Sequence, residues 1–299
     1  MKIIITGSLG HISKPLTAQL LKGGHTVTVI SSKEDRREEI EALGATAAIG
    51  SVEDIDFLTK TYTGADAVYT MVPPNHYFDK NLDLIPYYER LGANYYQAIK
   101  NAGVKRLVNL STIGGNLSEG NGILKGAHRV ELTLNKLGDD VAITHMRPTS
   151  FNYNLYGYVD SIKNKGLIAA NYGGQDIVPW VSPLDIADAV AEELVTINPV
   201  NKVRYVCSEE LSCSETARIL GEAIGKPDLK WITITDKEAL DHLLAVGMNP
   251  EIAEGLVEMY GALHSGLLAQ DYFANRPTVM GKVKMKDFAE EFAAVFNQK

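Results

Sequence analysis

The 299-residue sequence has 29 lysines and arginines against 37 aspartates and glutamates, which gives a formal net charge of −8. With 45% hydrophobic and 22% charged residues, it has the composition of a globular protein and enough length to bury a large core. An acidic chain disfavours a wide nucleic-acid interface, because such interfaces need clustered lysines and arginines. No direct nucleic-acid partner is therefore expected.

Several other classes are also disfavoured. The two cysteines are too few for a disulfide framework, and the seven histidines lack the spacing of paired metal ligands, so no metal site is predicted. No apolar run approaches the roughly 18 to 20 residues of a membrane span, and the apolar run at the N-terminus is too short for a signal peptide. We therefore expect a cytoplasmic protein with no membrane partner.

The first half of the sequence alternates short β-branched runs with amphipathic segments. In chain order we expect strands at 2–6, 26–30, 45–49, 67–72, 105–111 and 141–146. Between them we expect a helix that ends before Gly23 and further helices at 33–43, 55–62, 87–102 and 130–137. Strands that alternate with helices imply βαβ units. The predicted fold class is therefore α/β, with a doubly wound parallel sheet of Rossmann type.

The alternation weakens after residue 150. Aromatic, Asn-rich and Gly-rich sequence follows, and then helices are expected at 184–196, 214–224, 236–246, 250–268 and 286–296. We predict a dinucleotide-binding Rossmann domain at 1–150 and a smaller, mostly helical lobe at 151–299. A segment near 177–197 is expected to return to the sheet.

A glycine-containing turn links the first strand to the first helix. Gly7 permits a tight turn, and Gly10 permits close approach of a diphosphate, which the N–H groups at the helix start would attract. Ser13 stands where a third small residue is needed. This interpretation assigns cofactor binding to Gly7, Ser8, Leu9, Gly10, His11 and Ile12. Two glycines three residues apart also occur in ordinary turns between a strand and a helix.

The end of the second strand indicates which dinucleotide binds. An acid there would accept a hydrogen bond from the ribose 2′-hydroxyl, whereas a cation would accommodate a 2′-phosphate. The sequence has no acid at this point but has Ser31, Ser32 and Lys33, followed by Arg36. These residues favour NADP and leave NAD open. Alternatively, the segment is only a solvated, mixed-charge helix start, because Glu34 and Asp35 lie within it.

The sequence resembles the atypical short-chain dehydrogenase/reductases, and within them the NmrA-like family with its quinone-oxidoreductase-type branch. The residues that carry the resemblance are the glycine spacing from Thr6 to Ser13, Ser111-Thr112 after the fifth strand, the segment 147–151 that begins Arg-Pro, and the segment 183–187 that contains Asp-Ile-Ala. The resemblance covers essentially the whole chain. It implies that Met71, Val72 and Pro73 lie beneath the nicotinamide ribose.

The same resemblance implies a Ser or Thr after the fifth strand and a Tyr-x-x-x-Lys on the next helix. Ser111 or Thr112 matches the first part, but no tyrosine occurs between Thr112 and His128. The alignment places Leu124 at the tyrosine position and His128 at the lysine position. Without the tyrosine acid, hydride transfer from NADPH to a quinone or a small conjugated carbonyl is the predicted reaction.

Two residues are predicted to assist this reaction, with three more contacting the acceptor. His128 and Ser111 would donate hydrogen bonds to ribose or substrate, and His128 would also relay protons. Alternatively, His128 is only a surface histidine on the first helical turn. Phe151, Asn152 and Tyr153 follow the sixth strand, where a flat acceptor could stack. These three residues are equally suited to packing at a domain junction.

Two other functions fit the same residues. An NADP-binding, redox-sensing regulator of the NmrA type also lacks the catalytic tyrosine. A sugar-nucleotide epimerase is disfavoured, because its chemistry needs a base at the tyrosine position. A small-molecule substrate is the expected partner, and a homodimer is compatible with the sequence.

Overall fold

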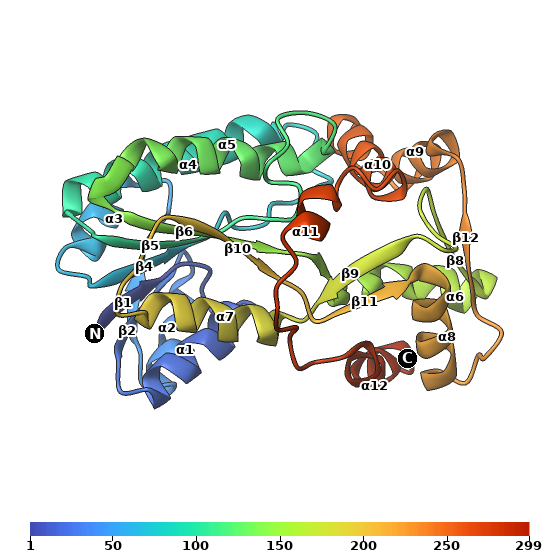
Figure 1. Cartoon of the computed structure of the whole chain (residues 1–299), viewed down its shortest axis with the longest axis horizontal. Coiled ribbons are helices and arrows are strands. Elements are labelled where there is room, and N and C mark those ends of the chain that lie inside the picture. The colour runs from blue at the N-terminus through green and yellow to red at the C-terminus, as the bar shows by residue number, and fades with distance from the viewer. Residues whose placement is uncertain (299) are drawn as a thin grey trace.

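The computed structural model describes residues 1–298, and its central element is a seven-stranded parallel sheet (Figure 1). The strands are β1 (Lys2–Ile5), β2 (Thr26–Ser31), β3 (Thr46–Ile49), β4 (Ala67–Thr70), β5 (Arg106–Leu110), β6 (Ala142–Pro148) and β10 (Lys202–Val206). Their order across the sheet is β10-β6-β5-β4-β1-β2-β3, and every neighbouring pair is parallel. The strand order therefore reverses between β1 and β4, where a doubly wound sheet binds its ligands.

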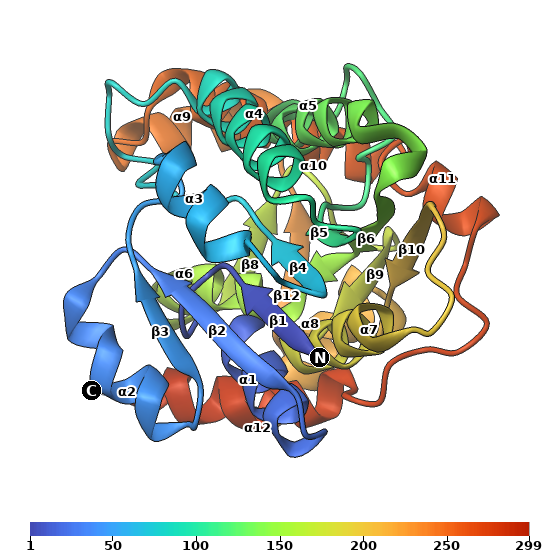
Figure 2. The same ribbon diagram turned by 90° about the vertical axis from the view of Figure 1, so that its left-hand side faces the viewer.

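Helices cover both faces of this sheet (Figure 2). One face carries α1 (Ser13–Lys22), α2 (Arg37–Ala42) and α7 (Pro183–Val195), and the other carries α3 (Ile55–Tyr62), α4 (Leu84–Ala102) and α5 (Lys125–Leu134). Successive residues of β1 serve opposite faces, because Ile3 and Ile5 pack with the first set and Ile4 with the second. The predicted Rossmann-type α/β fold is confirmed.

Several element boundaries differ from the sequence prediction. The helix expected at 33–43 is a 3-10 turn followed by α2, and the helix expected at 130–137 lies at Lys125–Leu134 in α5. The first turn of this helix packs closely on α4, since a Cβ on Gly126 would lie 2.6 Å from the Tyr88 ring. Glycine at this position lets the first turn of α5 contact α4 directly.

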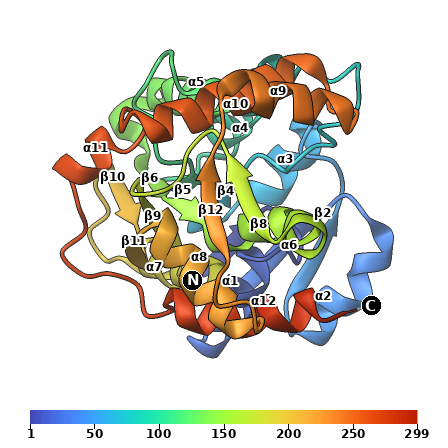
Figure 3. The same ribbon diagram turned by 90° about the vertical axis from the view of Figure 1, so that its right-hand side faces the viewer.

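The second half contains strands that the sequence did not predict (Figure 3). Its helices are α6 (Val159–Lys165), α8 (Cys213–Ala223), α9 (Asp236–Ala245), α10 (Pro250–His264), α11 (Gln270–Ala274) and α12 (Met285–Phe296). They surround a three-stranded sheet of β11 (Glu209–Ser212), β9 (Ile177–Val181) and β7 (Ser150–Phe151), and a pair formed by β12 (Lys230–Thr233) and β8 (Leu167–Ala170). The division at residue 150 remains a prediction.

The expected return to the main sheet involves two elements. Helix α7 packs beside α1 on the main sheet, whereas β9, which also lies in the segment 177–197, belongs to the small sheet. The strand that extends the main sheet is β10, which comes after that segment. None of the described helices is long and apolar enough to cross a membrane.

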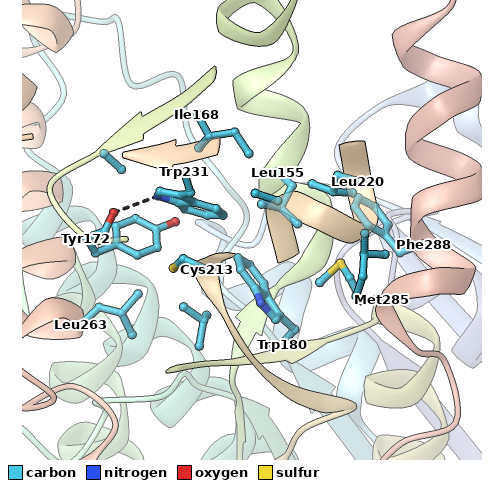
Figure 4. Packing of buried hydrophobic residues seen from close by; sticks show 14 of the residues in the cluster. Leu155, Ile168, Tyr172, Trp180, Cys213, Leu220, Trp231, Leu263, Met285 and Phe288 are labelled. Carbon is cyan, nitrogen blue, oxygen red and sulfur yellow. Dashed lines mark hydrogen bonds between the residues drawn. The ribbon is translucent and has the colours of Figure 1, made fainter. Parts of the chain in front are cut away.

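Two tryptophans anchor the core of the second half (Figure 4). Trp231 donates from its indole to the Tyr172 carbonyl at 2.9 Å, and Trp180 donates to Thr216 at 3.1 Å. Both side chains are buried, and Cys213 lies in the same cluster. Satisfied indole N–H groups allow these large rings to be buried without an unpaired donor.

A buried carboxylate fixes the final connection of the chain. Asp185, in the first turn of α7, accepts hydrogen bonds from Ser208 at 2.6 Å and from the backbone of Lys282 and Val283 at 2.8 and 3.1 Å. These contacts attach the segment before α12 to the helix that covers the main sheet. Asp185 belongs to the Asp-Ile-Ala segment of the sequence, and its role here is structural.

Removing this carboxylate should destabilise the fold. We expect Asp185→Ala to lower the free energy of unfolding by about 2–3 kcal/mol, because the buried Ser208 hydroxyl and two partly buried backbone N–H groups would lose a charged acceptor. The matched control is Asp188→Ala, which removes only the exposed pair with Lys282. Urea unfolding followed by circular dichroism compares the variants, and equal midpoints for Asp185→Ala and wild type would contradict the assignment.

Candidate functional site

The turn between β1 and α1 has a backbone suited to an anion. Gly7 has φ of +92°, and Ser8 at +52° is the only non-glycine residue with positive φ in residues 1–298. Within that part of the chain, no hydrogen-bond acceptor occurs for the backbone N–H groups of Leu9, His11 and Ile12. Helix α1 also begins without a side-chain cap. Unpaired N–H groups at a helix start are the donors that a diphosphate uses.

Ser13 explains how the turn tolerates a residue other than Gly or Ala at the third small position. Its hydroxyl is buried and donates to the Thr6 carbonyl at 2.9 Å, which joins the start of α1 to the end of β1. A Cβ on Gly7 would lie 2.6 Å from the same hydroxyl oxygen. Gly10 is exposed, and a Cβ there would meet only the Gly7 carbonyl, at 3.2 Å. Gly10 therefore leaves the turn open to solvent at this point.

The end of β2 lies against this turn. The Ser8 hydroxyl donates to Ser31 at 3.0 Å, and the Ser8 backbone donates to Ile30 at 3.0 Å. These bonds hold Ser8 in its strained conformation. Ser32 and Lys33 follow on the exposed surface.

The basic side chains after β2 differ in whether they are already paired with a carboxylate. Arg36 pairs with Glu39 at 2.6 Å, and Arg37 pairs with Glu34 at 2.6 Å. No carboxylate in residues 1–298 pairs with Lys33. Lys33 is therefore the cation of this segment that can meet a phosphate without first breaking an ion pair.

The residues after β4 lie beside the glycine turn. Thr6 accepts from the Met71 backbone at 3.0 Å, and Tyr95 donates to the Met71 carbonyl at 2.7 Å. Atoms of the Met71 side chain would lie 3.3 Å from a Cβ on Gly7. Met71, Val72 and Pro73 therefore continue from the strand that neighbours β1, at the point where the strand order reverses.

Ser111 belongs to a buried ionic network. Its hydroxyl donates to Glu131, whose carboxylate receives two hydrogen bonds from the Arg147 guanidinium at 2.6 and 2.9 Å. Arg147 also pairs with Asp271, which accepts from Tyr205. Burial disfavours the charge of Arg147, but its hydrogen bonds and attraction to Glu131 outweigh this and raise its pKa. The Ser111 hydroxyl is thus engaged within the protein, and the network joins β5, α5, β6, β10 and α11.

His128 lies on α5 and is half-buried, with its Nδ1 2.8 Å from the Gly115 carbonyl. Because a carbonyl only accepts, Nδ1 must carry the hydrogen in this bond. The Gly115 backbone in turn donates to the Thr112 carbonyl at 3.1 Å. His128 therefore fixes the loop after β5, in which Thr112 is half-buried.

Three rings stack beside the glycine turn. The Tyr153 ring stacks on His11 at a centroid distance of 4.9 Å and on Phe151 at 5.2 Å. The structure thus brings a predicted substrate residue into contact with a predicted cofactor residue. Asn152 is buried, and its Oδ1 has no hydrogen-bond partner in residues 1–298. An unpaired buried amide is costly unless a ligand satisfies it.

Two further tyrosines approach this group from distant parts of the chain. Tyr77, in the segment between β4 and α4, and Tyr260, on α10, are both half-buried and pack against the same cluster of buried residues. Burial, and then the proximity of Tyr77, raise the pKa of both Tyr153 and Tyr260 to about 12. Sequence reasoning missed both residues, because neither lies in a motif and only tertiary packing brings them near Tyr153.

The segment that carries Tyr77 is held by the second half of the chain. Asn249, which caps α10, donates from its side chain to the carbonyls of Asp79 and Leu82 at 2.9 and 3.1 Å, and its backbone donates to Tyr77 at 2.9 Å. Lys80 donates to the Met248 carbonyl at 2.7 Å. The C-terminal helices therefore position residues that follow β4 at the ligand-binding edge of the sheet.

Comparisons with known proteins agree with this geometry. Residues 7–151 match the model of an NAD(P)H-binding family. The chain is 25% identical to an NAD(P)H azoreductase of Xenophilus azovorans over 98% of its own length and 99% of that protein. The structure of a triphenylmethane reductase from Citrobacter sp. superposes with a TM-score of 0.79 at 20% identity, covering 98% of this chain and 99% of that one. An NADPH-dependent quinone oxidoreductase from Escherichia coli, solved with NADPH, gives 0.79 at 17% identity, covering 97% and 99%.

Proposed function

Residues 7–151 match the model of an NAD(P)H-binding family, and on this premise we propose that the protein is an NADPH-dependent reductase of quinones or other conjugated acceptors. The observation that carries the proposal is the unpaired N–H groups of the glycine turn, which lie beside stacked rings rather than beside a Tyr-x-x-x-Lys pair. When bound, the dinucleotide supplies a hydride. The chain itself supplies the donors that hold the diphosphate and the surfaces that orient the acceptor.

The residues present fit the cofactor. The turn at residues 7–12 has three backbone N–H groups without acceptors, and Met71 to Pro73 lie at the end of the neighbouring strand. His128, by holding the loop that includes Thr112, is proposed to position that loop against the nicotinamide ribose. Phe151, Asn152 and Tyr153 are proposed to contact the acceptor, with the free Asn152 amide binding a polar group.

The relatives support the class of acceptor. An azoreductase, a triphenylmethane reductase and a quinone oxidoreductase are named for conjugated aromatic or quinoid acceptors. Such molecules spread the charge that a hydride brings over a delocalised system, so they depend less on an acid than a simple carbonyl does, which suits a chain without the Tyr-x-x-x-Lys of the family. We therefore propose aromatic quinones first, with azo and triphenylmethane dyes as the next classes to test.

Lys33 should determine the preference for NADPH. We expect Lys33→Glu to weaken NADPH binding by about 10- to 100-fold, because the 2′-phosphate would lose a charge-assisted hydrogen bond and meet a like charge. NADH binding should change little, and Lys33→Glu combined with Arg36→Glu should weaken NADPH further. Dissociation constants come from fluorescence titration, with Lys22→Glu at the far end of α1 as the charge control. Equal losses for both nucleotides would contradict the assignment.

Turnover with a panel of quinones tests the proposed activity. Purified protein should oxidise NADPH in the presence of at least one quinone, at a rate that depends on quinone concentration and falls in Lys33→Glu at subsaturating NADPH. Tight NADPH binding without oxidation on any quinone, azo dye or triphenylmethane dye would contradict the reductase proposal. That result, with unequal affinities for NADP and NADPH, would instead favour the redox-sensing regulator.

A further inference from the structure

Tyr153 stacks on the glycine turn, and its hydroxyl has no role in the contacts proposed so far. It lies in the 3-10 segment Asn152–Tyr158, directly after the strand β7. Its ring stacks on His11 with an interplanar angle of 27° and on Phe151 with one of 28°. Because His11 belongs to the glycine turn, the Tyr153 ring is in direct contact with that turn.

The hydroxyl of Tyr153 is neutral and unpaired. Burial and the charge of Tyr77 act on this hydroxyl, but no hydrogen bond to another group within residues 1–298 does. Burial, with the neighbouring Tyr77 hydroxyl, raises the pKa of Tyr153 to about 12, so the group keeps its proton at neutral pH. A neutral phenol without an internal acceptor is a hydrogen-bond donor available to a ligand.

The two acids predicted from the sequence are engaged elsewhere. Ser111 donates to the buried carboxylate of Glu131. His128 uses its Nδ1 hydrogen for the Gly115 carbonyl. These two hydrogens are therefore committed to partners within the chain, whereas the Tyr153 hydroxyl is not.

We propose that Tyr153 donates the proton that neutralises the reduced acceptor, and that His11 acts as a positioning residue for its ring. This inference rests on the proposed reductase function. The hydride brings two electrons from NADPH to a quinone, and negative charge develops on a quinone oxygen. In the same step the O–H bond of Tyr153 breaks as a new O–H bond forms on that oxygen, which leaves NADP, a neutral hydroquinone and a tyrosinate. Water then returns a proton to the tyrosinate. Tyr153 thereby supplies the proton that the tyrosine of a Tyr-x-x-x-Lys motif would supply, since residues 113–128 contain no tyrosine.

A pair of variants separates the hydroxyl from the ring. Tyr153→Phe keeps the stacking surface and removes only the proton, and Tyr77→Phe is the matched control because Tyr77 lies nearby but does not stack on the glycine turn. With saturating NADPH, Tyr153→Phe should reduce kcat by about 10- to 100-fold for quinones whose hydroquinones are most basic, within the range of general acid catalysis. The reduction should shrink steadily as the hydroquinone becomes more acidic. A purely structural role would slow all quinones by the same factor.

A binding experiment tests the same residue without turnover. The anion of 4-nitrophenol resembles the reduced acceptor before protonation, and its absorbance reports its ionisation. In the complex with NADP, wild-type protein and Tyr77→Phe should bind this phenolate more tightly than Tyr153→Phe by about tenfold, the loss expected for one charge-assisted hydrogen bond. The dissociation constant for NADPH should remain the same in all three proteins.

The stacking partner has its own test. His11→Ala should lower kcat while leaving KM for the quinone nearly unchanged, because the Tyr153 ring loses its support. His11→Phe restores an aromatic face and should recover most of the rate.

The outcomes distinguish the inference from the proposed function. If wild-type protein reduces quinones but Tyr153→Phe matches it across the whole series, the acid role of Tyr153 is wrong and the reductase proposal survives. If wild-type protein reduces no acceptor, the reductase proposal fails. The phenolate titration then decides whether Tyr153 is a donor to an anionic oxygen: equal affinities in wild type and Tyr153→Phe would overturn it.

Discussion

Gly10→Asp should abolish NADPH binding while the protein remains folded. Gly10 is exposed, and the Cβ of a substituted residue would meet only the Gly7 carbonyl, at 3.2 Å. The new carboxylate would lie among the free N–H groups at the start of α1, where it would occupy the donors and repel a diphosphate. We expect a loss of affinity of at least about 100-fold, equivalent to about 2.7 kcal/mol.

The control places the same charge elsewhere on the same helix. Gln19→Asp lies on an exposed position of α1, away from its N-terminus, and should bind NADPH as wild type does. Nucleotide fluorescence measures binding in each variant, and circular dichroism checks the fold. Wild-type affinity in a folded Gly10→Asp protein would show that the diphosphate binds elsewhere.

Arg147→Met should cost about 3–5 kcal/mol of unfolding free energy. The Arg147 and Glu131 side chains are only 8% and 6% exposed, so removing the guanidinium leaves a carboxylate buried without its counter-ion. Tyr205 and Asp271 would also lose a partner. Because the network joins strands of the main sheet to α5 and α11, the loss should affect global stability rather than a single loop.

A double variant tests whether the charge is the cause. Replacing both partners, as in Arg147→Met with Glu131→Met, removes the buried charge as well as the ion pair and should recover more than half of the lost stability. Urea unfolding gives the free energy of unfolding of wild type, of each single variant and of the double variant. If the double variant is as unstable as the sum of the two single variants, the loss comes from packing and not from an uncompensated carboxylate.

The fold could be predicted in the first half because local sequence and tertiary structure agree there. The run at residues 2–6 is β-branched and ends at a glycine, and the structure has β1 followed by a turn at positive φ. The second half was less predictable. Strand β9 includes Pro179, which lacks a backbone donor and argues against a strand, yet it pairs with β11 on one side and β7 on the other.

The candidate site, too, could be predicted only in part from the sequence. Spacing located the glycine turn and the segment 151–153, but it could not show that Tyr153 stacks on His11. Nor could it show that Ser111 donates to Glu131, because the direction of a hydroxyl depends on how α5 packs beside β5. Tyr77 and Tyr260 reach the same region from segments about 180 residues apart, and no local pattern encodes that proximity.

Calorimetric titration of the purified protein with NADPH, and then with NADH, tests most directly whether the glycine turn holds a dinucleotide. We predict one binding site per chain for each nucleotide, with NADPH bound more tightly than NADH. Absence of binding heat with either nucleotide across several temperatures, in a protein shown to be folded, would contradict the account.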